Sequence, residues 1–214
     1  AHAADTLEWR CKVLLDDKPI GFHDYRVAVD GEQRRVAMNA KFDVKFLFFN
    51  AYSYEHRNEE TWQSGCLTDI DAYTDANGKE SNVIGTLQDD TFVLQTNGER
   101  QTVDQCVRSF AYWDASLLKA ERLLNTQTGE LEAIDIGPAQ EASVDVDGQP
   151  VAAVRHEIDV KGKTISVWYA KDDARWLALE APAKGDRTLR YAPVDVPTAR
   201  IYQQALAGSA ASGD

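Results

Sequence analysis

Three histidines lie at positions where an alternation of polar and apolar residues predicts β-strands. His23 alternates with Tyr25, His56 follows Tyr54, and His156 stands between a valine and an isoleucine of one face. Imidazoles from three separate strands can hold zinc or copper or ligate a haem, because such sites need no close spacing in the sequence. The competing interpretation is that they are core or rim histidines, hydrogen-bonded to nearby polar side chains. A metal or haem module based on His23, His56 and His156 is therefore an alternative hypothesis, and the main hypothesis includes no cofactor.

The sequence also contains carboxylates that an enzyme acting on an envelope lipid or glycan would use as acid or base, namely Glu55, Glu59 and Glu60. No phosphate-binding loop, dinucleotide fingerprint or HExxH motif accompanies them. The acidic stretch DIDAYTDANGKE does not match an EF-hand, because the best register puts Ile84 at the twelfth position, where glutamate is required. With no nucleophile or oxyanion feature beside a base, we predict no catalytic residue. An envelope enzyme stays an alternative hypothesis.

An aromatic stretch, FDVKFLFFNAYSYEH at 42–56, is the most unusual feature of the chain. It alternates as a half-buried strand until the FLFF run, where both faces become apolar. Such a strand is either packed on both sides by the protein itself or opens onto a ligand or a protein partner. Apolar aromatic walls accept an acyl chain, and the polar tips of tyrosines suit a rim that is half exposed to water. With the cluster FAYWD at 110–114, the stretch predicts a ligand site formed by Phe46, Phe48, Phe49, Tyr52, Tyr54, His56, His23, Tyr112 and Trp113.

The elements that must position these residues are mostly hairpins. Alternating segments separated by turn dipeptides such as Asn77-Gly78 and Asp147-Gly148 predict them. A corner is expected at Asn50–Ala51. The expected strands cover about 6–16, 20–30, 34–48, 52–62, 66–74, 80–88, 90–96, 130–136, 142–147, 150–160, 163–171, 174–181 and 186–192.

Two segments depart from this pattern. DASLLKAERLLN at 114–125 predicts a helix, with Asp114 as N-cap and leucines on one side. A weaker helix is expected at 198–207, followed by the disordered tail GSAASGD. Because long twisted sheets curl to protect their edges, the predicted fold class is mainly β. It is a single antiparallel β-meander, curled into a closed or half-open barrel with the helix at about 114–125 as plug or lid. We expect one domain at 4–195 and a C-terminal extension at 196–214.

Composition limits the partners of the protein. Its 214 residues carry a formal net charge of −12, which disfavours nucleic acid and electrostatic docking on anionic lipid headgroups. The longest apolar run, FLFF, is far shorter than the roughly 18 residues of a membrane span. Ala1-His2-Ala3 is typical of the end of a secretory signal peptide, the alternative being an artificial extension left by cloning. Three cysteines allow three pairings, and we predict a disulfide between Cys66 and Cys106, because Cys11 lies in an alternating apolar strand.

Several blocks of the sequence together resemble a family of uncharacterised exported bacterial proteins. The resemblance is carried by LLDDKPIGFHDYRV at 14–27, FDVKFLFFNAYSYEHRNEETWQSGCLTDIDAYTDANG at 42–78, FAYWDASLLKAERLLNTQTGEL at 110–131 and WYAKDDARWLALEAPAKGDRTLRY at 168–191. It implies export and a β-rich fold, without an activity that carries over. More loosely, the chain is similar to the periplasmic carriers of lipids and lipoproteins, in which a curved sheet wraps a helix.

These observations lead to a main hypothesis of a periplasmic or secreted bacterial binding protein or carrier for an apolar ligand, such as a lipid or a fatty acyl group. His23 or His56 would hydrogen-bond a polar headgroup of that ligand. No nucleic-acid partner is expected. A protein partner at the aromatic surface is left open, and catalysis is not part of the main hypothesis.

Overall fold

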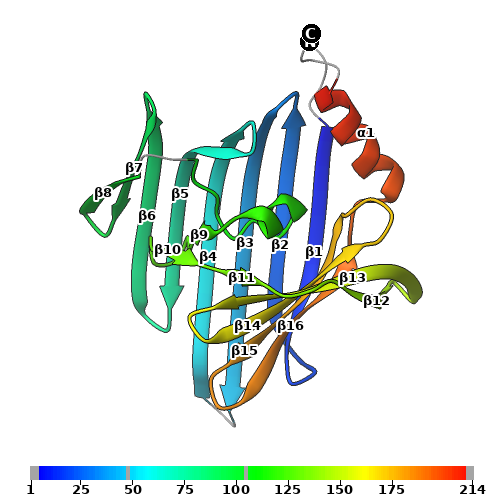
Figure 1. Ribbon diagram of the computed structural model, residues 1–214. Helices are drawn as coiled ribbons and strands as arrows, with labels where there is room; N and C mark the ends of the chain where they lie inside the picture. Colours follow the sequence, from blue (N-terminus) through cyan, green and yellow to red (C-terminus); the bar gives the residue numbers. More distant parts are fainter. Residues whose placement is uncertain (1–4, 47–48, 104–105, 211–214) are drawn as a thin grey trace.

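The chain folds as a succession of β-hairpins whose strands alternate between buried and exposed residues (Figure 1). This computed structural model describes residues 5–46, 49–103 and 106–210, with the backbone alone for 45, 46, 49–51 and 207–210. The first strand shows why the strands form. Leu7, Trp9 and Val13 are buried, and the polar residues between them are exposed.

The described part of the chain contains two runs of strands, with an internal segment between them. The first run consists of β1 (Asp5–Leu15), β2 (Lys18–Asp30), β3 (Gln33–Phe46), β4 (Phe49–Gln63), β5 (Cys66–Ala76), β6 (Lys79–Gln88), β7 (Thr91–Thr96) and β8 (Glu99–Val103). The second run consists of β11 (Asp135–Ile136), β12 (Gln140–Val146), β13 (Gln149–Val160), β14 (Lys163–Ala170), β15 (Trp176–Ala183) and β16 (Arg187–Asp195). The expected hairpins are confirmed, except that the strand expected at 130–136 is two separate strands, Leu131–Ala133 and β11. β8 is a strand that the sequence pattern did not predict.

Turn chemistry explains why neighbouring strands pair in sequence order. At Asn77-Gly78 both residues have positive φ, 58° and 82°, and at Asp147-Gly148 the values are 51° and 75°. Two consecutive residues with positive φ match the twist of tight two-residue hairpins, which is why Asn-Gly and Asp-Gly are preferred there. The strands on either side of each turn are therefore held in antiparallel register.

Both runs belong to one sheet, because the last strand pairs with the first. β16 lies antiparallel to β1, with Val13 opposite Tyr191 and Leu15 opposite Leu189. Within the described ranges the fourteen strands form a single antiparallel sheet that ends at β8 on one side and at β11 and β12, which both pair with β13, on the other. These two ends do not pair with each other in the part of the chain that the structure describes. The sheet is therefore the half-open form of the predicted barrel.

The internal segment, residues 106–134, lies inside the curl of the sheet, and we call it the plug. It contains the 3-10 helix η1 (Ala115–Lys119) and the short hairpin β9 (Arg122–Leu124) and β10 (Leu131–Ala133). In Figure 1 the plug lies between the wall formed by β1–β8 and the crossing strands β13–β16. Its side chains Val107, Ala111, Trp113, Leu117, Leu123 and Leu124 join the main apolar core.

The prediction of a helix over 114–125 is correct only at its beginning. Asp114 is the N-cap, since its carboxylate accepts a hydrogen bond from the Ser116 amide at 2.9 Å. The helical turn ends at Ala120, whose backbone is extended, and the chain continues as β9. Leu123 and Leu124 are adjacent in sequence, yet both are fully buried, which a helix with one apolar face does not achieve. Burial on both sides of this segment therefore overrides its helical pattern.

The predicted corner at Asn50–Ala51 is not found. β4 begins at Phe49 and runs without interruption through these two residues. Lys45 pairs with Asn50 and Val44 with Tyr52, so the register shift at this point leaves Ala51 as an extra residue in β4. A bulge therefore takes the place of the corner. The connection at 47–48 lies outside the described residues.

A C-terminal helix and a disulfide complete the fold. The predicted C-terminal helix is α1 (Ala199–Ala210), which packs against β1 through an edge-to-face contact of Tyr202 with Trp9. The predicted tail falls partly on 211–214, outside the described residues. No helix in the ranges described here is long and apolar enough to span a membrane. Cys66 and Cys106 form the predicted disulfide, which ties the start of β5 to the start of the plug.

Candidate functional site: a cavity between sheet and plug

A cavity of about 310 Å³ lies where both runs of strands face the plug. β2, β3 and β4 form one wall, β13 to β16 form the opposite wall, and the plug lies across them. Its buried part is formed by His23, Tyr25, Tyr54, His56, Glu132, Val160, Leu179 and Tyr191. Phe110 and Tyr112 line it from the plug.

The buried wall is a group of stacked rings. The His23 imidazole stacks on Tyr25 with ring centroids 4.5 Å apart and meets Tyr191 edge-on at 4.8 Å. Tyr54 stacks on Phe42 at 4.6 Å. Burial raises the pKa of Tyr25, of Tyr54 and of Tyr191, so these phenols are neutral at pH 7. The wall that the strands contribute is therefore aromatic and uncharged, and the buried carboxylate of the lining, Glu132, belongs to the plug.

Both cavity histidines are neutral at pH 7 as well. Burial lowers the pKa of His23 to about 3 and that of His56 to about 4. His56 is held by two hydroxyl groups, with Nδ1 at 2.8 Å from Thr74 Oγ1 and Nε2 at 3.3 Å from Thr126 Oγ1. Neither ring nitrogen of His23 has a hydrogen-bond partner among the described residues. His56 is thus a fixed polar link between β4 and the plug, whereas His23 packs among rings.

The open side of the cavity is polar, and we call it the mouth. It is formed by Asn125, Thr126, Gln127, Lys161 and Lys163. Lys161, in the turn between β13 and β14, forms ion pairs with Glu130 and with Glu132, the latter at 3.1 Å. These hydrogen bonds raise the pKa of Lys161. The mouth therefore carries polar and charged side chains around an apolar interior.

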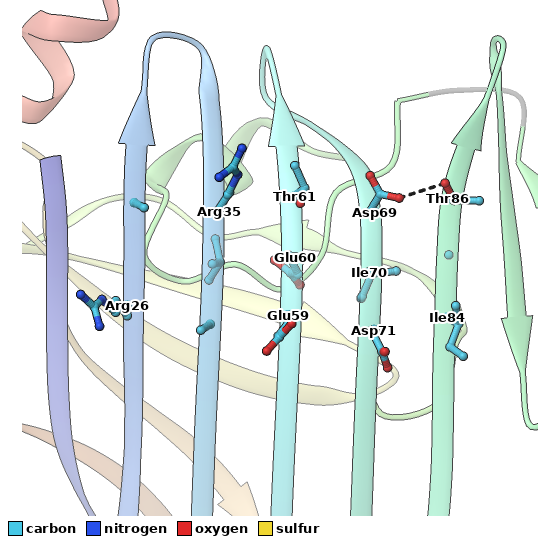
Figure 2. Close-up of a pocket in the computed structure, with 14 residues that line it drawn as sticks. Arg26, Arg35, Glu59, Glu60, Thr61, Asp69, Ile70, Asp71, Ile84 and Thr86 are labelled. Atoms are coloured by element: carbon cyan, nitrogen blue, oxygen red, sulfur yellow. Dashed lines mark hydrogen bonds between the residues drawn. The ribbon is translucent and has the colours of Figure 1, made fainter. Parts of the chain in front are cut away.

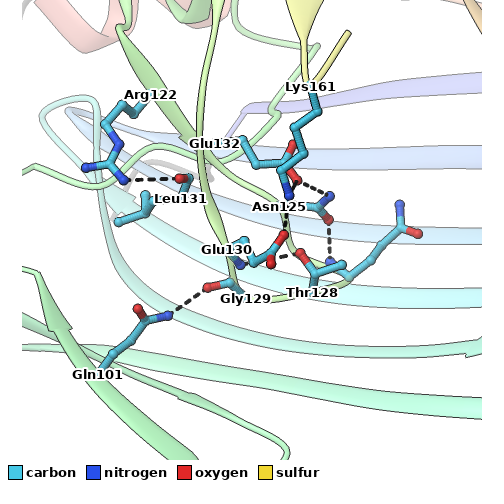
Figure 3. Close-up of polar contacts among 10 residues, drawn as sticks. Gln101, Arg122, Asn125, Thr128, Gly129, Glu130, Leu131, Glu132 and Lys161 are labelled. Atoms are coloured by element: carbon cyan, nitrogen blue, oxygen red, sulfur yellow. Dashed lines mark hydrogen bonds and ion pairs between the residues drawn. The ribbon is translucent and has the colours of Figure 1, made fainter. Parts of the chain in front are cut away.

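The turn of the plug hairpin is held by side chains from β8 and from the turn between β13 and β14, as Figure 3 shows. From the β8 side, Gln101 donates a hydrogen bond to the Gly129 carbonyl at 2.8 Å. Gly129 has a positive φ of 71°, and a Cβ on it would lie 1.8 Å from the Thr96 hydroxyl oxygen, so a side chain is excluded there. From the other side Lys161 holds Glu130 and Glu132. The plug hairpin thus connects β8 to the β13–β14 turn through side-chain contacts, although the strands at the two ends of the sheet do not pair with each other in the described residues.

The structure brings several of the predicted ligand-site residues together. Four of them line the cavity, namely His23, Tyr54, His56 and Tyr112. Trp113 instead lines a separate cleft of about 390 Å³, with Trp62 and Tyr202. Tyr52 is 38% exposed and lies outside the cavity lining. For Phe46 and Phe49 only the backbone is described and Phe48 lies outside the described residues, so their role stays a prediction.

The three predicted metal-binding histidines do not form a shared site. His23 and His56 line the cavity, but His156 is on β13, where its ring lies 6.5 Å from that of Tyr169. In the ranges described above, no three His, Cys, Asp or Glu side chains are placed to hold a metal ion. Alternation identified the face of each strand correctly, but it does not say how far along the barrel each side chain lies. The three-histidine site is therefore wrong.

The candidate enzyme carboxylates are separated by the sheet. Glu59 is exposed on the outer face, whereas Glu60 is buried on the inner face. Glu59 lies in a hollow of about 500 Å³ over β2 to β6, together with Arg26 and Asp71 (Figure 2). The charged side chains of this outer hollow are exposed and hydrated, and the hollow lies on a single face of the sheet, whereas the cavity lies between two walls and the plug. The outer hollow is thus larger than the cavity but less suited to a small ligand.

Glu60 is buried and hydrogen-bonded, so its substitution should change the stability of the fold. Its carboxylate accepts hydrogen bonds from Asn58 and from the Trp62 indole, each at 2.8 Å. Glu60→Ala should lower the free energy of unfolding by about 3 kcal/mol, because two buried donors lose their partner. Burial raises the pKa of Glu60, so the folded state retains its proton to higher pH than the unfolded chain does. The ionisation of Glu60 therefore lowers the free energy of unfolding of the wild type as pH rises above the unfolded-state pKa of this carboxyl group.

The Glu60→Gln variant separates these two effects. It keeps the side-chain volume and an acceptor but cannot ionise, so its stability relative to the wild type should rise as pH increases above the unfolded-state pKa of glutamate, about 4.3. Urea unfolding at several pH values measures this difference. A difference that stays constant with pH would contradict the assignment of Glu60 as a buried carboxylate.

Residues from the second run of strands are the part of the site that sequence reasoning missed. These residues are Tyr191, Leu179 and the two mouth lysines, all within the segment β13–β16. The alternation predicts the strands of this segment, but it does not indicate which strands of the first run lie opposite them. The pairing of β16 with β1 brings this run of strands across from β2–β4.

An antiparallel sheet curled around an internal plug, with a cavity beside it, defines the class of β-barrel-like proteins. Residues 12–194 match the family described as a domain of unknown function (DUF6134), and the chain belongs to this family. The predicted resemblance to an uncharacterised family is thus confirmed, while export is not addressed by it. Comparison with curated proteins finds no significant match.

The fold is shared with a solved structure. The chain is similar to the beta-barrel-like protein of the domain of unknown function DUF1849 from Brucella abortus, with a TM-score of 0.60 and 13% identity over 92% of this chain and 100% of that chain. At this identity the likeness shows the fold alone. The antiparallel, barrel-like architecture expected from the sequence is confirmed by it.

Proposed function

We propose that this protein is a carrier that binds one small apolar or amphipathic molecule, such as a single fatty acyl group, in the cavity between sheet and plug. The observation that supports this most is the combination of an uncharged aromatic wall with a polar mouth. Ligand sites are typically concave and mostly apolar, with a few polar groups that set orientation. A volume of about 310 Å³ is roughly ten times the ~30 Å³ that one water occupies, so it suits a ligand of about ten heavy atoms.

We also propose that the protein works outside the cytoplasm, in the periplasm or as a secreted protein. The Cys66–Cys106 disulfide supports this, because disulfides persist in oxidising compartments. Thiol trapping in intact cells that naturally produce the protein tests the proposal. A protein that is exported should show only Cys11 as a reactive thiol after unfolding, whereas three reactive thiols would contradict it.

Binding of linear alcohols tests the proposed function without involving charge. Each methylene buried contributes about 0.8 kcal/mol, so affinity should rise about fourfold per carbon. The increase should stop near eight to ten carbons, when the cavity of about 310 Å³ is full. Isothermal titration with hexanol, octanol, decanol and dodecanol measures this series. Affinity that rises steadily through dodecanol would indicate binding elsewhere on the surface.

A substitution that fills the cavity should abolish this binding. Ala181 lines the cavity from β15, and Ala181→Phe places a ring in the space that the ligand needs. We expect octanol affinity to fall at least tenfold, with near-wild-type thermal stability. Ala37→Phe is the matched control, because Ala37 is exposed on the outer face of β3. Equal octanol affinity of the two variants would overturn the proposed site.

A further inference from the structure

The charges at the mouth point to the headgroup of the ligand. The chain as a whole has a formal net charge of −12, yet the cavity lining contains two lysines, Lys161 and Lys163, against one carboxylate, Glu132. Glu132 shares the ammonium of Lys161, 3.1 Å away, with Glu130, and it accepts a hydrogen bond from Asn125 at 3.2 Å. Glu130, beside the mouth, is also paired with Lys161.

Lys163 is the charge that remains without a counter-ion. It begins β14, two residues after Lys161, and its side chain lines the mouth. Among the described residues it forms no ion pair. An ammonium group at the opening of an apolar cavity attracts anions and repels cations, and less so at high salt. Lys163 is therefore the ammonium at the mouth that can pair with an incoming anion, beside the group of Lys161, Glu130 and Glu132, whose net charge is −1.

We propose that the cavity selects a single-chain carboxylate, with the carboxylate at Lys163 and the chain against the tyrosines. The proposal rests on the proposed function and adds the ligand's headgroup and orientation to it. One unpaired ammonium matches one negative charge, which favours a monocarboxylate over a dianion. The reverse orientation is excluded by the deep wall, because burying a carboxylate among neutral rings without a cation carries a large desolvation cost.

The volume of the cavity and the position of the charge together suggest a suitable probe. Octanoate has ten heavy atoms, which corresponds to the volume of about 310 Å³. Its methyl end would contact Tyr25, Leu179 and Tyr191, and its carboxylate would remain at the mouth. His23 and His56 are neutral and take no part in charge recognition.

Titration with three eight-carbon probes tests the proposal. Octanoate, 1-octanol and octyltrimethylammonium share a chain and differ in headgroup charge. We expect octanoate to bind about threefold or more tightly than octanol, and octyltrimethylammonium to bind most weakly, in line with the effect of one exposed charge pair. The preference for octanoate should decrease at 0.5 M NaCl.

Charge variants assign the preference to Lys163. Lys163→Glu should weaken octanoate about fivefold or more and leave octanol affinity within twofold, since it adds repulsion as well as removing attraction. Lys12→Glu is the control with the same change in net charge, because Lys12 is exposed on β1, outside the cavity lining. It should leave both affinities unchanged.

The outcomes separate this proposal from the one it rests on. If octanol and octanoate bind equally and Lys163→Glu behaves like Lys12→Glu, headgroup selection is overturned while the cavity remains the binding site. If no eight-carbon probe binds, or if Ala181→Phe leaves binding intact, the proposed function itself fails.

Discussion

Acidification from pH 7 to pH 5 should destabilise this protein by about 2 kcal/mol for each of its two cavity histidines. Unfolding exposes both imidazoles, which then bind protons below about pH 6.5. In the folded protein His56 binds a proton only near pH 4 and His23 near pH 3, because burial lowers both pKa values. The unfolded state therefore binds more protons throughout this window, and the free energy of unfolding falls as pH falls.

The variant His23→Phe isolates this effect from the carboxylates, which also titrate in acid. Phenylalanine retains the ring that stacks on Tyr25 but takes up no proton in the unfolded state. Chemical unfolding at pH 7 and at pH 5 should show the variant gaining about 2 kcal/mol on the wild type between the two. His156→Phe is the comparison and should gain less, since His156 is only partly buried. A gain from His23→Phe that is independent of pH would show that this imidazole is not buried as described.

Loss of the Cys66–Cys106 disulfide should lower the free energy of unfolding by about 4 kcal/mol. The bond closes a loop with a sequence separation of 40 residues, and the entropy of such a loop in the unfolded chain sets this magnitude. The double variant Cys66→Ala, Cys106→Ala measures it in urea, and dithiothreitol should reproduce it in the wild type. Because the bond anchors the start of the plug, we also expect the double variant to bind octanol more weakly.

Cys11→Ala provides the control for this experiment. Cys11 is a buried free thiol in β1, so its loss removes a small side chain from the core without opening a loop. It should cost about 1 kcal/mol and leave dithiothreitol sensitivity in place. If the disulfide variant were no less stable than Cys11→Ala, the plug would have to be anchored by its apolar contacts alone.

Local signals in the sequence were enough to predict most of the sheet. Asn77-Gly78 and Asp147-Gly148 predict their hairpins because positive φ at both residues is needed there, and the strands between such turns alternate. The same alternation placed His23, Tyr54 and His56 on the inner face. What it could not provide is the pairing of β16 with β1, which joins residues far apart in sequence and is set by the curl of the whole sheet.

The errors at 114–125 and at Asn50–Ala51 have a common physical cause. At 114–125 the leucine spacing satisfies a helix, but tertiary burial of both Leu123 and Leu124 favours a strand. At Asn50–Ala51 the turn-forming asparagine predicts a corner, whereas the structure has a β-bulge within β4. In both places long-range packing overrides a local preference, and the same long-range packing brings Lys163 and Tyr191 to the cavity.

The most direct test of the proposed ligand site is a crystal structure of the protein with 8-bromooctanoate, using the anomalous signal of bromine. The proposal predicts a single strong bromine peak beside Tyr25, Leu179 and Tyr191, with the carboxylate about 3 Å from the Lys163 ammonium. A bromine peak confined to the outer hollow by Glu59, or a cavity that stays empty at saturating ligand, would contradict it.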